Sequence, residues 1–193
     1  MRRVFPRILL GLALLLGAPS GGAADEQAAW AALREGGQVA LMRHADAPGG
    51  AGDPSGFRLD DCTTQRNLSE EGRADAKAVG EAFKSAGVAV GRILSSPWCR
   101  CVDTARLLAL GPVEIEPTFS NAFVLADRRD ALTAGARAVI GGWRGPGTLL
   151  VVTHGANIQA LTGYNPSAGE VVVVTARNGD ALQPIGRIPV PRR

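Results

Sequence analysis

The stretch QVALMRH, residues 38–44, is a short apolar run that follows two glycines and ends in arginine and histidine. Apolar side chains without alternation are typical of a strand that is buried on both faces of a sheet. The stretch TLLVVTH, residues 148–154, has the same form and also ends in histidine. Because ligands bind beyond the carboxyl ends of parallel strands, we expect His44 and His154 to belong to one site.

Helical and extended segments alternate along the rest of the chain. Helices are expected from Ser69 to Gly87, from Ser96 to about Leu110 and from Asp127 to Trp143, and strands at residues 92–95, 113–116, 171–174 and, as an edge strand, within 182–190. Residues 45–66, rich in Gly, Pro and Asp, are expected to form a long loop at the substrate rim. The alternation predicts the α/β fold class, as a three-layer α/β/α sandwich with a mostly parallel central sheet and helices on both faces.

The chain begins with a segment that differs from the rest. Basic residues come first, an apolar run follows at residues 8–16, and small residues end at Ala24. This order is typical of a cleavable secretory signal. The apolar run is about half of the roughly 20 residues that a membrane-spanning helix needs, so no stable membrane anchor is expected. We therefore predict a signal peptide at residues 1–24, a single domain at residues 25–193, and a periplasmic or secreted protein.

Charge is balanced outside that segment. The chain has 21 Lys and Arg against 18 Asp and Glu, and the surplus comes from Arg2, Arg3 and Arg7. The predicted domain therefore has no basic surplus that would favour nucleic acid or an anionic membrane as a partner.

Cys62, Cys99 and Cys101 lie in the predicted domain. In an oxidising compartment Cys62 could pair with Cys99 or with Cys101, and three reduced, partly buried thiols are an equally weighted alternative. Cys99 and Cys101 are too close in sequence to pair with each other on a helix. The chain holds only two histidines, and we expect no metal site and no cofactor.

The two histidines, together with Arg43 and Arg100, suit phosphoryl transfer. Guanidinium groups match the oxygens of a phosphoryl group with paired donors. A neutral imidazole can attack phosphorus and form a covalent intermediate. A second histidine adds a donor where the transition state carries charge. The pattern predicts an enzyme that transfers phosphoryl groups.

Four short motifs follow one another along the chain. They are LMRHA at residues 41–45, LSEEGRA at 68–74, SSPWCR at 95–100 followed by Thr104-Ala105, and VTHG at 152–155. Together they resemble the histidine phosphatase superfamily, also called phosphoglycerate mutase-like, although Ala45 stands where that family has glycine. The resemblance covers residues 38–175. It implies metal-independent hydrolysis of phosphate monoesters through a phosphohistidine.

The resemblance implies a role for each matching catalytic residue. His44 would be phosphorylated, while Arg43, Arg100 and His154 would hold the phosphoryl group.

Three further residues are candidates for the same pocket. Gly155 would let the backbone approach the phosphoryl group closely. Asn157, at the start of the next helix, is either a further phosphate contact or a helix cap. Arg66 is either part of the pocket rim or a solvated loop arginine.

The family's proton donor has no match in this sequence. Mutase-related branches use a glutamate after the third strand, where this chain has FSNAF at residues 119–123, and acid-phosphatase branches use an aspartate where it has Gly155-Ala156. The remaining candidates are Asp46 and Asp127, each with a solvated carboxylate as the alternative. Because losing a good general acid costs about 10² to 10⁴ in rate, a weak or inactive phosphatase-like module that binds phosphorylated ligands is the alternative function.

The length of the predicted domain and its resemblance to one branch of the family suggest the reaction and the substrate. The short domain favours net hydrolysis over mutase activity, which usually requires extra closing segments. Residues 153–158 and 169–171 resemble the lipopolysaccharide core heptose phosphatase branch. The predicted partner is a small phosphorylated substrate, with an envelope sugar phosphate as the specific hypothesis. A structural envelope protein with accidental motif matches is a third interpretation, and it requires the two histidines to lie far apart.

Overall fold

The computed structural model describes residues 21–50, 52–175 and 182–192. Residues 1–20, which include the apolar run of the predicted signal peptide, lie outside the described residues. The signal peptide and the domain boundary after residue 24 therefore stay predictions. Among the helices that are described, none combines the length and the apolar character that a membrane span requires.

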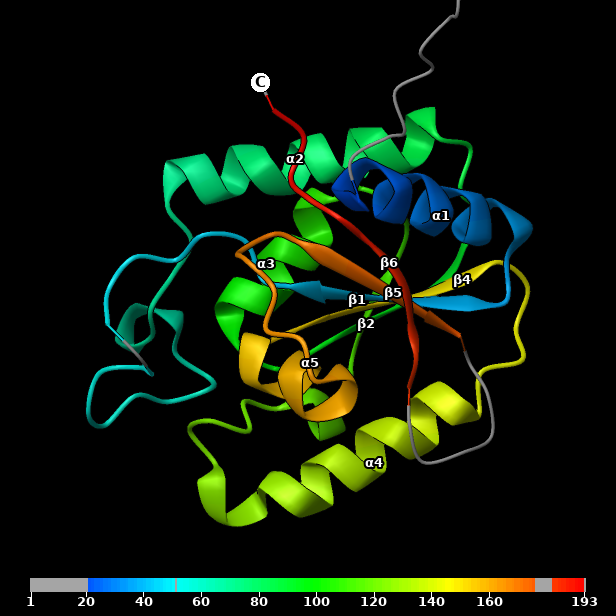
Figure 1. The fold of residues 1–193 in the computed structure, drawn as a ribbon. Helices are drawn as coiled ribbons and strands as arrows, with labels where there is room; N and C mark the ends of the chain where they lie inside the picture. Colours follow the sequence, from blue (N-terminus) through cyan, green and yellow to red (C-terminus); the bar gives the residue numbers. More distant parts are fainter. Residues whose placement is uncertain (1–20, 51, 176–181, 193) are drawn as a thin grey trace, which may run out of the picture.

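A six-stranded sheet forms the centre of the molecule, in the order β3-β2-β4-β1-β5-β6 (Figure 1). Its strands are β1 (Gln38–Arg43), β2 (Val90–Ser95), β3 (Val113–Ile115), β4 (Thr148–Thr153), β5 (Val171–Thr175) and β6 (Pro184–Ile188). The first four pair in parallel, whereas β5 is antiparallel to both β1 and β6. The predicted strands and the mostly parallel sheet are confirmed.

Strand β5 runs antiparallel to its neighbour β1. Helix α5 (Gly155–Thr162) and residues 163–170 connect it to β4. As a result β5 begins beside the carboxyl end of β1, where Val171 pairs with Met42.

Helices cover both faces of the sheet (Figure 1). α1 (Gly21–Glu35), α2 (Glu70–Ser85) and α3 (Cys99–Leu107) lie on one face, and α4 (Arg129–Gly141) and α5 lie on the other. Alternate residues of one strand serve the two faces: Ala40 and Met42 belong to the core under α1, α2 and α3, and Val39 and Leu41 to the core under α4 and α5. The predicted three-layer α/β/α sandwich is confirmed.

Capping explains one correct helix start and one incorrect one. Ser69 accepts a 2.9 Å hydrogen bond from the Gly72 N–H and begins α2, as predicted. The start predicted at Ser96 is wrong, because α3 begins at Cys99. Ser96 Oγ is hydrogen-bonded to His154 and therefore does not cap the helix.

Two other helices differ from the sequence prediction. The helix expected from Asp127 to Trp143 consists of a 3-10 turn, η3 (Ala126–Arg128), followed by α4, which ends at Gly141. Helix α1 was not predicted, because its sequence is rich in alanine and lacks a clear apolar stripe. Two further 3-10 turns are η1 (Cys62–Thr64) and η2 (Pro117–Phe119).

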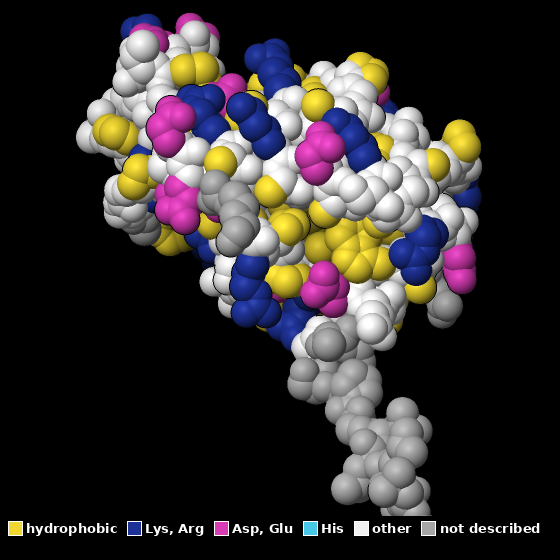
Figure 2. Space-filling model, turned by 90° about the horizontal axis from the view of Figure 1, so that it is seen from above, with side chains coloured by type: hydrophobic (Ala, Val, Ile, Leu, Met, Phe, Trp, Pro, Cys, Tyr) yellow, Lys and Arg dark blue, Asp and Glu magenta, His cyan; other side chains and the backbone are white. Residues whose placement is uncertain are grey.

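The face formed by α1 and α2 carries a groove of about 1110 Å³. Trp30, Ala82 and residues 188–192 contribute to its walls. Figure 2 looks onto this side of the molecule and shows hydrophobic side chains gathered between charged ones. The groove shares no lining residue with the pocket at the strand ends.

Candidate active site

A pocket of about 460 Å³ brings together the residues that follow three parallel strands. Arg43 ends β1 and His44 follows it, His154 follows β4, and Arg100 lies in the first turn of α3 after β2. These four residues line the pocket together with Gly49, Gly50, Gly52, Arg66, Asn121, Phe123, Gly155, Ala156, Gln159 and Asn165.

The register of the sheet accounts for this convergence. Arg43 pairs with Thr153, so the histidines that come next lie at the same level of neighbouring strands. The ladder continues one residue further, because the His44 N–H donates to Thr153 O at 2.9 Å. Ser95 of β2 pairs with Val152, which brings the start of α3 to the same edge.

His44 is held as a neutral imidazole with one defined tautomer. Its Nδ1 lies 2.8 Å from the carbonyl of Ala45, which only accepts, so Nδ1 carries the proton. Its Nε2 accepts a 3.3 Å hydrogen bond from Nε of Arg100. The pKa of His44 is lowered to about 3 by burial and by the positive charges of Arg100 and Arg43. Nε2 is therefore unprotonated at neutral pH, and its lone pair faces Nε of Arg100.

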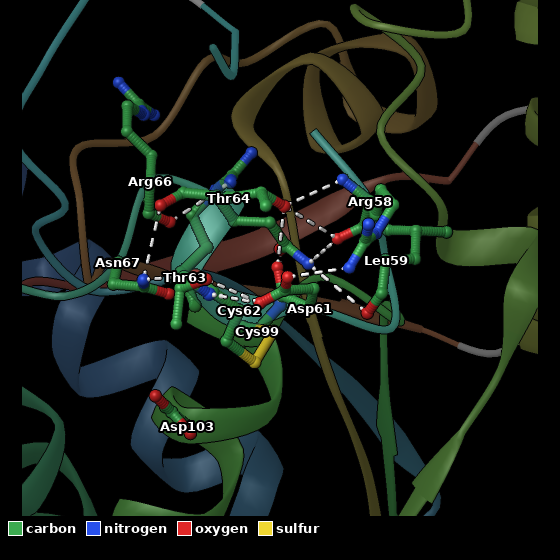
Figure 3. Close-up of a disulfide and its surroundings, with 12 residues drawn as sticks. Arg58, Leu59, Asp61, Cys62, Thr63, Thr64, Arg66, Asn67, Cys99 and Asp103 are labelled. Atoms are coloured by element: carbon green, nitrogen blue, oxygen red, sulfur yellow. Dashed lines mark hydrogen bonds and ion pairs between the residues drawn. A yellow bond between two sulfur atoms is a disulfide. The ribbon is translucent and has the colours of Figure 1, made fainter. Parts of the chain in front are cut away.

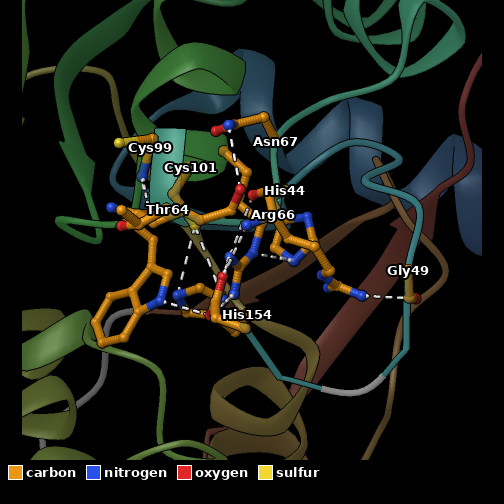
Figure 4. A network of polar contacts seen from close by, with 12 residues as sticks. His44, Gly49, Thr64, Arg66, Asn67, Cys99, Cys101 and His154 are labelled. Carbon is orange, nitrogen blue, oxygen red and sulfur yellow. Dashed lines mark hydrogen bonds and ion pairs between the residues drawn. The ribbon is translucent and has the colours of Figure 1, made fainter. Parts of the chain in front are cut away.

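His154 lies beside His44, with ring centroids 5.4 Å apart. Its Nε2 shares a 2.9 Å hydrogen bond with Ser96 Oγ. The same atom lies 3.5 Å from Sγ of Cys101, and both residues are labelled in Figure 4. Burial, and then the proximity of His44 and Arg100, holds the pKa of His154 well below its usual range. His154 is therefore a second neutral imidazole in the pocket.

Arg43 is anchored at one end of its guanidinium group. Its Nη1 donates to Pro166 O at 2.8 Å, while its buried Nε has no partner among the described residues. Gly155 gives this side chain room, since a Cβ there would lie 3.4 Å from Cδ of Arg43 and 2.7 Å from Oδ1 of Asn165. The unpartnered Nε–H is available to an anion in the pocket.

Arg100 is almost completely buried and forms an ion pair with Asp53. Its Nη1 donates to Oδ1 of Asp53 at 2.7 Å and its Nη2 to Oδ2 at 3.1 Å. Burial by itself would raise the pKa of Asp53, but the hydrogen bonds and charge of Arg100 outweigh it and hold that pKa below its ordinary value. Sequence analysis missed Asp53, because no local pattern distinguishes it from the other acids of the loop.

The loop over the pocket is tied down by side chains and by one disulfide. Arg66, one of the predicted rim residues, lines the pocket, and its Nη1 donates to the carbonyls of Gly49 and Gly50. Cys62 is bonded to Cys99 at the start of α3 (Figure 3), and Cys101 is a free, buried thiol. Of the pairings that the sequence left open, the structure contains the one between Cys62 and Cys99.

Three sequence candidates lie away from the lining described above. Asp46 accepts a 2.7 Å hydrogen bond from Ser69 Oγ and so faces the start of α2. Asp127 belongs to η3, outside the pocket. Asn157 is buried, donating to Ser120 O at 2.8 Å and accepting from the Ala122 N–H at 3.1 Å, so it joins α5 to the segment after η2.

The charge of the pocket favours an anion. Arg43, Arg66 and Arg100 line it, and no Asp or Glu is among its described lining residues. Burial and the neighbouring charge of Arg100 lower the pKa of Arg66, which reflects how closely the three guanidinium groups gather. Asn121, Gln159 and Asn165 add neutral polar groups that sequence analysis did not single out. A tetrahedral oxyanion fits this set of donors.

Comparisons with known proteins agree with this geometry. Residues 39–123 match the Histidine phosphatase superfamily (branch 1). A solved structure of the protein histidine phosphatase SixA complexed with tungstate is 20% identical, with a TM-score of 0.51 over 78% of this chain and 96% of that chain. A phosphoserine phosphatase from Entamoeba histolytica, in complex with 3-phosphoglyceric acid, is 15% identical, with a TM-score of 0.52 over 79% of this chain and 96% of that chain.

A mycobacterial glucosyl-3-phosphoglycerate phosphatase is 19% identical, with a TM-score of 0.50 over 71% of this chain and 89% of that chain. No curated protein matches the chain. At these identities the solved structures establish a shared fold, and the resemblance to the heptose phosphatase branch stays a prediction. The family match and the shared fold together confirm the wider resemblance, and they relate this chain to the histidine phosphatase superfamily.

Proposed function

We propose that this chain is an exported, metal-independent phosphatase that hydrolyses phosphate monoesters through a phosphohistidine on His44. The observation that carries the proposal is the orientation of His44. Its Nδ1–H is engaged by the Ala45 carbonyl, and its Nε2 lone pair faces Arg100 inside a cationic pocket. The family match supports the same class of reaction.

In the first step the phosphoryl oxygens are held by Arg43, Arg100 and His154. Nε2 of His44 attacks phosphorus, a P–N bond forms, and the P–O bond to the leaving group breaks. The arginine donors stabilise the charge on the transferring group. The leaving oxygen takes a proton from water, since neither Asp46 nor Asp127 is among the described residues that line the pocket.

In the second step water attacks phosphorus and the P–N bond breaks. Inorganic phosphate leaves, and His44 returns to its neutral form with the lone pair on Nε2. The proton lost by the attacking water balances the proton that the leaving oxygen took up. The same arginine donors serve both steps, because the phosphoryl group stays in one place while its partner changes.

The missing general acid restricts the substrate. A leaving group that is stable as an anion departs without a proton, whereas a simple alcohol needs one. Loss of a general acid typically costs about 10² to 10⁴ in rate. We therefore expect aryl phosphates and other substrates with good leaving groups to react much faster than alkyl phosphates such as phosphoserine or a sugar phosphate.

The test measures phosphate release and the covalent intermediate together. The purified protein, incubated with para-nitrophenyl phosphate and a metal chelator, should turn over and should give an acid-labile phosphoprotein after rapid quenching. His44→Ala should lose both signals while keeping its circular dichroism spectrum. Equal turnover in His44→Ala would remove the proposal.

The second candidate function is a module that binds phosphorylated ligands without turning them over. The absence of Asp46 and Asp127 from the described pocket lining favours it. It predicts saturable binding of inorganic phosphate, lost in Arg100→Ala, with no product and no phosphoprotein after long incubation.

Export and the natural substrate are parts of the same proposal. The neighbouring structures include phosphatases named for phosphoserine and for glucosyl-3-phosphoglycerate, which are small phosphorylated compounds. For this chain we propose an envelope sugar phosphate, because the N-terminal sequence predicts export. Without a general acid among the described residues of the pocket, we expect such a substrate to be hydrolysed slowly. Mass spectrometry of the protein recovered from a cell-envelope extract should find a chain that begins near Asp25. Recovery of the unprocessed chain in the cytoplasm alone would contradict export.

A further inference from the structure

Asp53 is a buried carboxylate that is paired with the pocket residue Arg100. Its side chain is 0% exposed and accepts four hydrogen bonds. Two come from Arg100, at 2.7 and 3.1 Å, one from Nε1 of Trp98 at 2.9 Å, and one from the N–H of Arg66 at 3.1 Å. Arg66 and Arg100 line the pocket, and Trp98 packs against the pocket residue His154, with ring centroids 5.4 Å apart. Such complete satisfaction marks a fixed position rather than a mobile side chain.

The hydrogen bonds of Arg100 show which edge of its guanidinium group stays open. A guanidinium group has five N–H donors in one plane. The end formed by Nη1 and Nη2 is taken by Asp53, and Nη1 also lies 3.5 Å from Arg66 O. Nε points at Nε2 of His44, and one hydrogen of Nη2 remains on that same side. The open edge, Nε with Nη2, therefore faces the nucleophile.

We propose that Asp53 is a positioning residue that aims the open edge of Arg100 at the phosphoryl group attacked by His44. The inference rests on the proposed use of the pocket by a phosphoryl group. Asp53 clamps the end formed by Nη1 and Nη2, so the adjoining edge, Nε with Nη2, presents two parallel donors to two phosphoryl oxygens. When the anion binds, the hydrogen bond that Nε of Arg100 donates shifts from Nε2 of His44 to a phosphoryl oxygen. The lone pair on Nε2 is then free to attack phosphorus.

An opposite interpretation is that Asp53 imitates the anion and must leave before the substrate binds. Two observations count against it. Asp53 is not among the described lining residues, and a pocket of about 460 Å³ exists while the ion pair is intact. Asp53 is also unsuited to be the missing proton donor, because Arg100 lowers its pKa and keeps it ionised at neutral pH.

The test measures binding of inorganic phosphate by titration calorimetry, which does not depend on turnover. Asp53→Asn keeps the shape of the side chain and removes its charge. We expect phosphate to bind about 10- to 100-fold more weakly, by analogy with the loss seen when residues that orient the ligands of a metal ion are removed. Asp61→Asn is the matched control: Asp61 lies in the same loop, bonds only locally to Thr63 and Arg58, and should bind phosphate as the unaltered protein does.

A double-mutant cycle shows whether Asp53 acts through Arg100. In the Arg100→Ala background, Asp53→Asn should change phosphate affinity by less than about twofold, because its target is gone. An equal loss in both backgrounds would make Asp53 a structural residue and overturn the proposal. Tighter phosphate binding by the Asp53→Asn single variant would show that the Asp53 carboxylate competes with the anion. That result would also overturn the proposal.

A crystal structure of the unaltered protein with inorganic phosphate covers the case in which Asp53→Asn fails to fold. The proposal requires both contacts between Asp53 and Arg100 to persist, with Nε and Nη2 of Arg100 on phosphate oxygens. Phosphate in the place of the Asp53 carboxylate would overturn it. Phosphate binding that depends on Asp53 in a protein without turnover would leave this inference standing and would reject the proposed catalysis.

Discussion

The candidate pocket has two walls that are built in different ways. The strand-end wall consists of Arg43, His44 and His154, whose backbones are held by the ladder between β1 and β4. The loop wall consists of Gly49, Gly50, Gly52 and Arg66, which lie outside the sheet on a loop held by side-chain hydrogen bonds and the disulfide. Arg100 touches both, through His44 and through Asp53.

This difference separates chemistry from binding. Backbone hydrogen bonds of the sheet hold the strand ends, so the nucleophile has little freedom to move. A loop outside the sheet is held by a few separate side-chain interactions, and losing any one of them can displace it. Changes in the strand-end wall should act mainly on the chemical step and on acid stability. Changes in the loop wall should act mainly on the binding of the anion.

The largest expected effect tests the strand-end wall with acid. The ordinary pKa of histidine, 6.5, is lowered to about 3 at His44, and His154 is also shifted well down. As the pH falls below 6.5, the unfolded chain takes up protons at both positions while the folded chain does not. The free energy of unfolding should therefore fall by about 1.4 kcal/mol per pH unit for each histidine, until the folded pKa is reached.

Urea denaturation at a series of pH values from about 7 to about 4 measures this slope. His44→Gln and His154→Gln should each reduce the slope of the free energy of unfolding against pH by about 1.4 kcal/mol per pH unit, the contribution of one histidine. Comparing each variant with the unaltered protein cancels the contribution of carboxylates. If both variants kept the full slope, the two imidazoles would not be buried in their neutral forms.

The next effect tests the loop wall through its disulfide. The Cys62–Cys99 bond joins residues 37 apart in sequence, and closing a loop of that length stabilises a protein by about 3 to 4 kcal/mol. We expect the double replacement Cys62→Ser with Cys99→Ser to lose about that much. Because Asp53 and Arg66 are then less firmly held, KM for para-nitrophenyl phosphate should rise more than kcat falls.

A reducing agent provides the control for this prediction. It should reproduce both effects in the unaltered protein and leave the double variant unchanged. An unchanged KM after reduction would show that the side-chain hydrogen bonds hold the loop wall without the disulfide.

The sequence predicted the strand-end wall because its information is local. His44 and His154 each follow an apolar run of strand length, and parallel strands bring such ends together. The same alternation of segments predicted the three layers. The start of α3 was predicted wrongly for a reason that is not local, since Ser96 bonds to His154, which is 58 residues away.

The loop wall could not be predicted in the same way. Asp53 is 47 residues from Arg100, and nothing near it in the sequence indicates that the loop turns back there. The choice between Cys99 and Cys101 depended on the orientation of α3. Residues two apart on a helix point in nearly opposite directions, so when Cys99 faces the loop, Cys101 faces His154 and the sheet.

The smallest expected effect separates positioning from packing within the strand-end wall. Ser95 and Ser96 are both fully buried. The Ser95 hydroxyl donates to the carbonyl of Ser96, whereas the Ser96 hydroxyl is hydrogen-bonded to His154. Ser95→Ala and Ser96→Ala should each lower the free energy of unfolding by about 1 kcal/mol. Ser96→Ala alone should also lower kcat, by about fivefold, because a loss of about 1 kcal/mol in the orientation of His154 falls on the transition state. If Ser95→Ala lowered kcat as much as Ser96→Ala does, the effect would come from packing. The hydrogen-bond ladder between β1 and β4, rather than the Ser96 hydroxyl, would then orient His154.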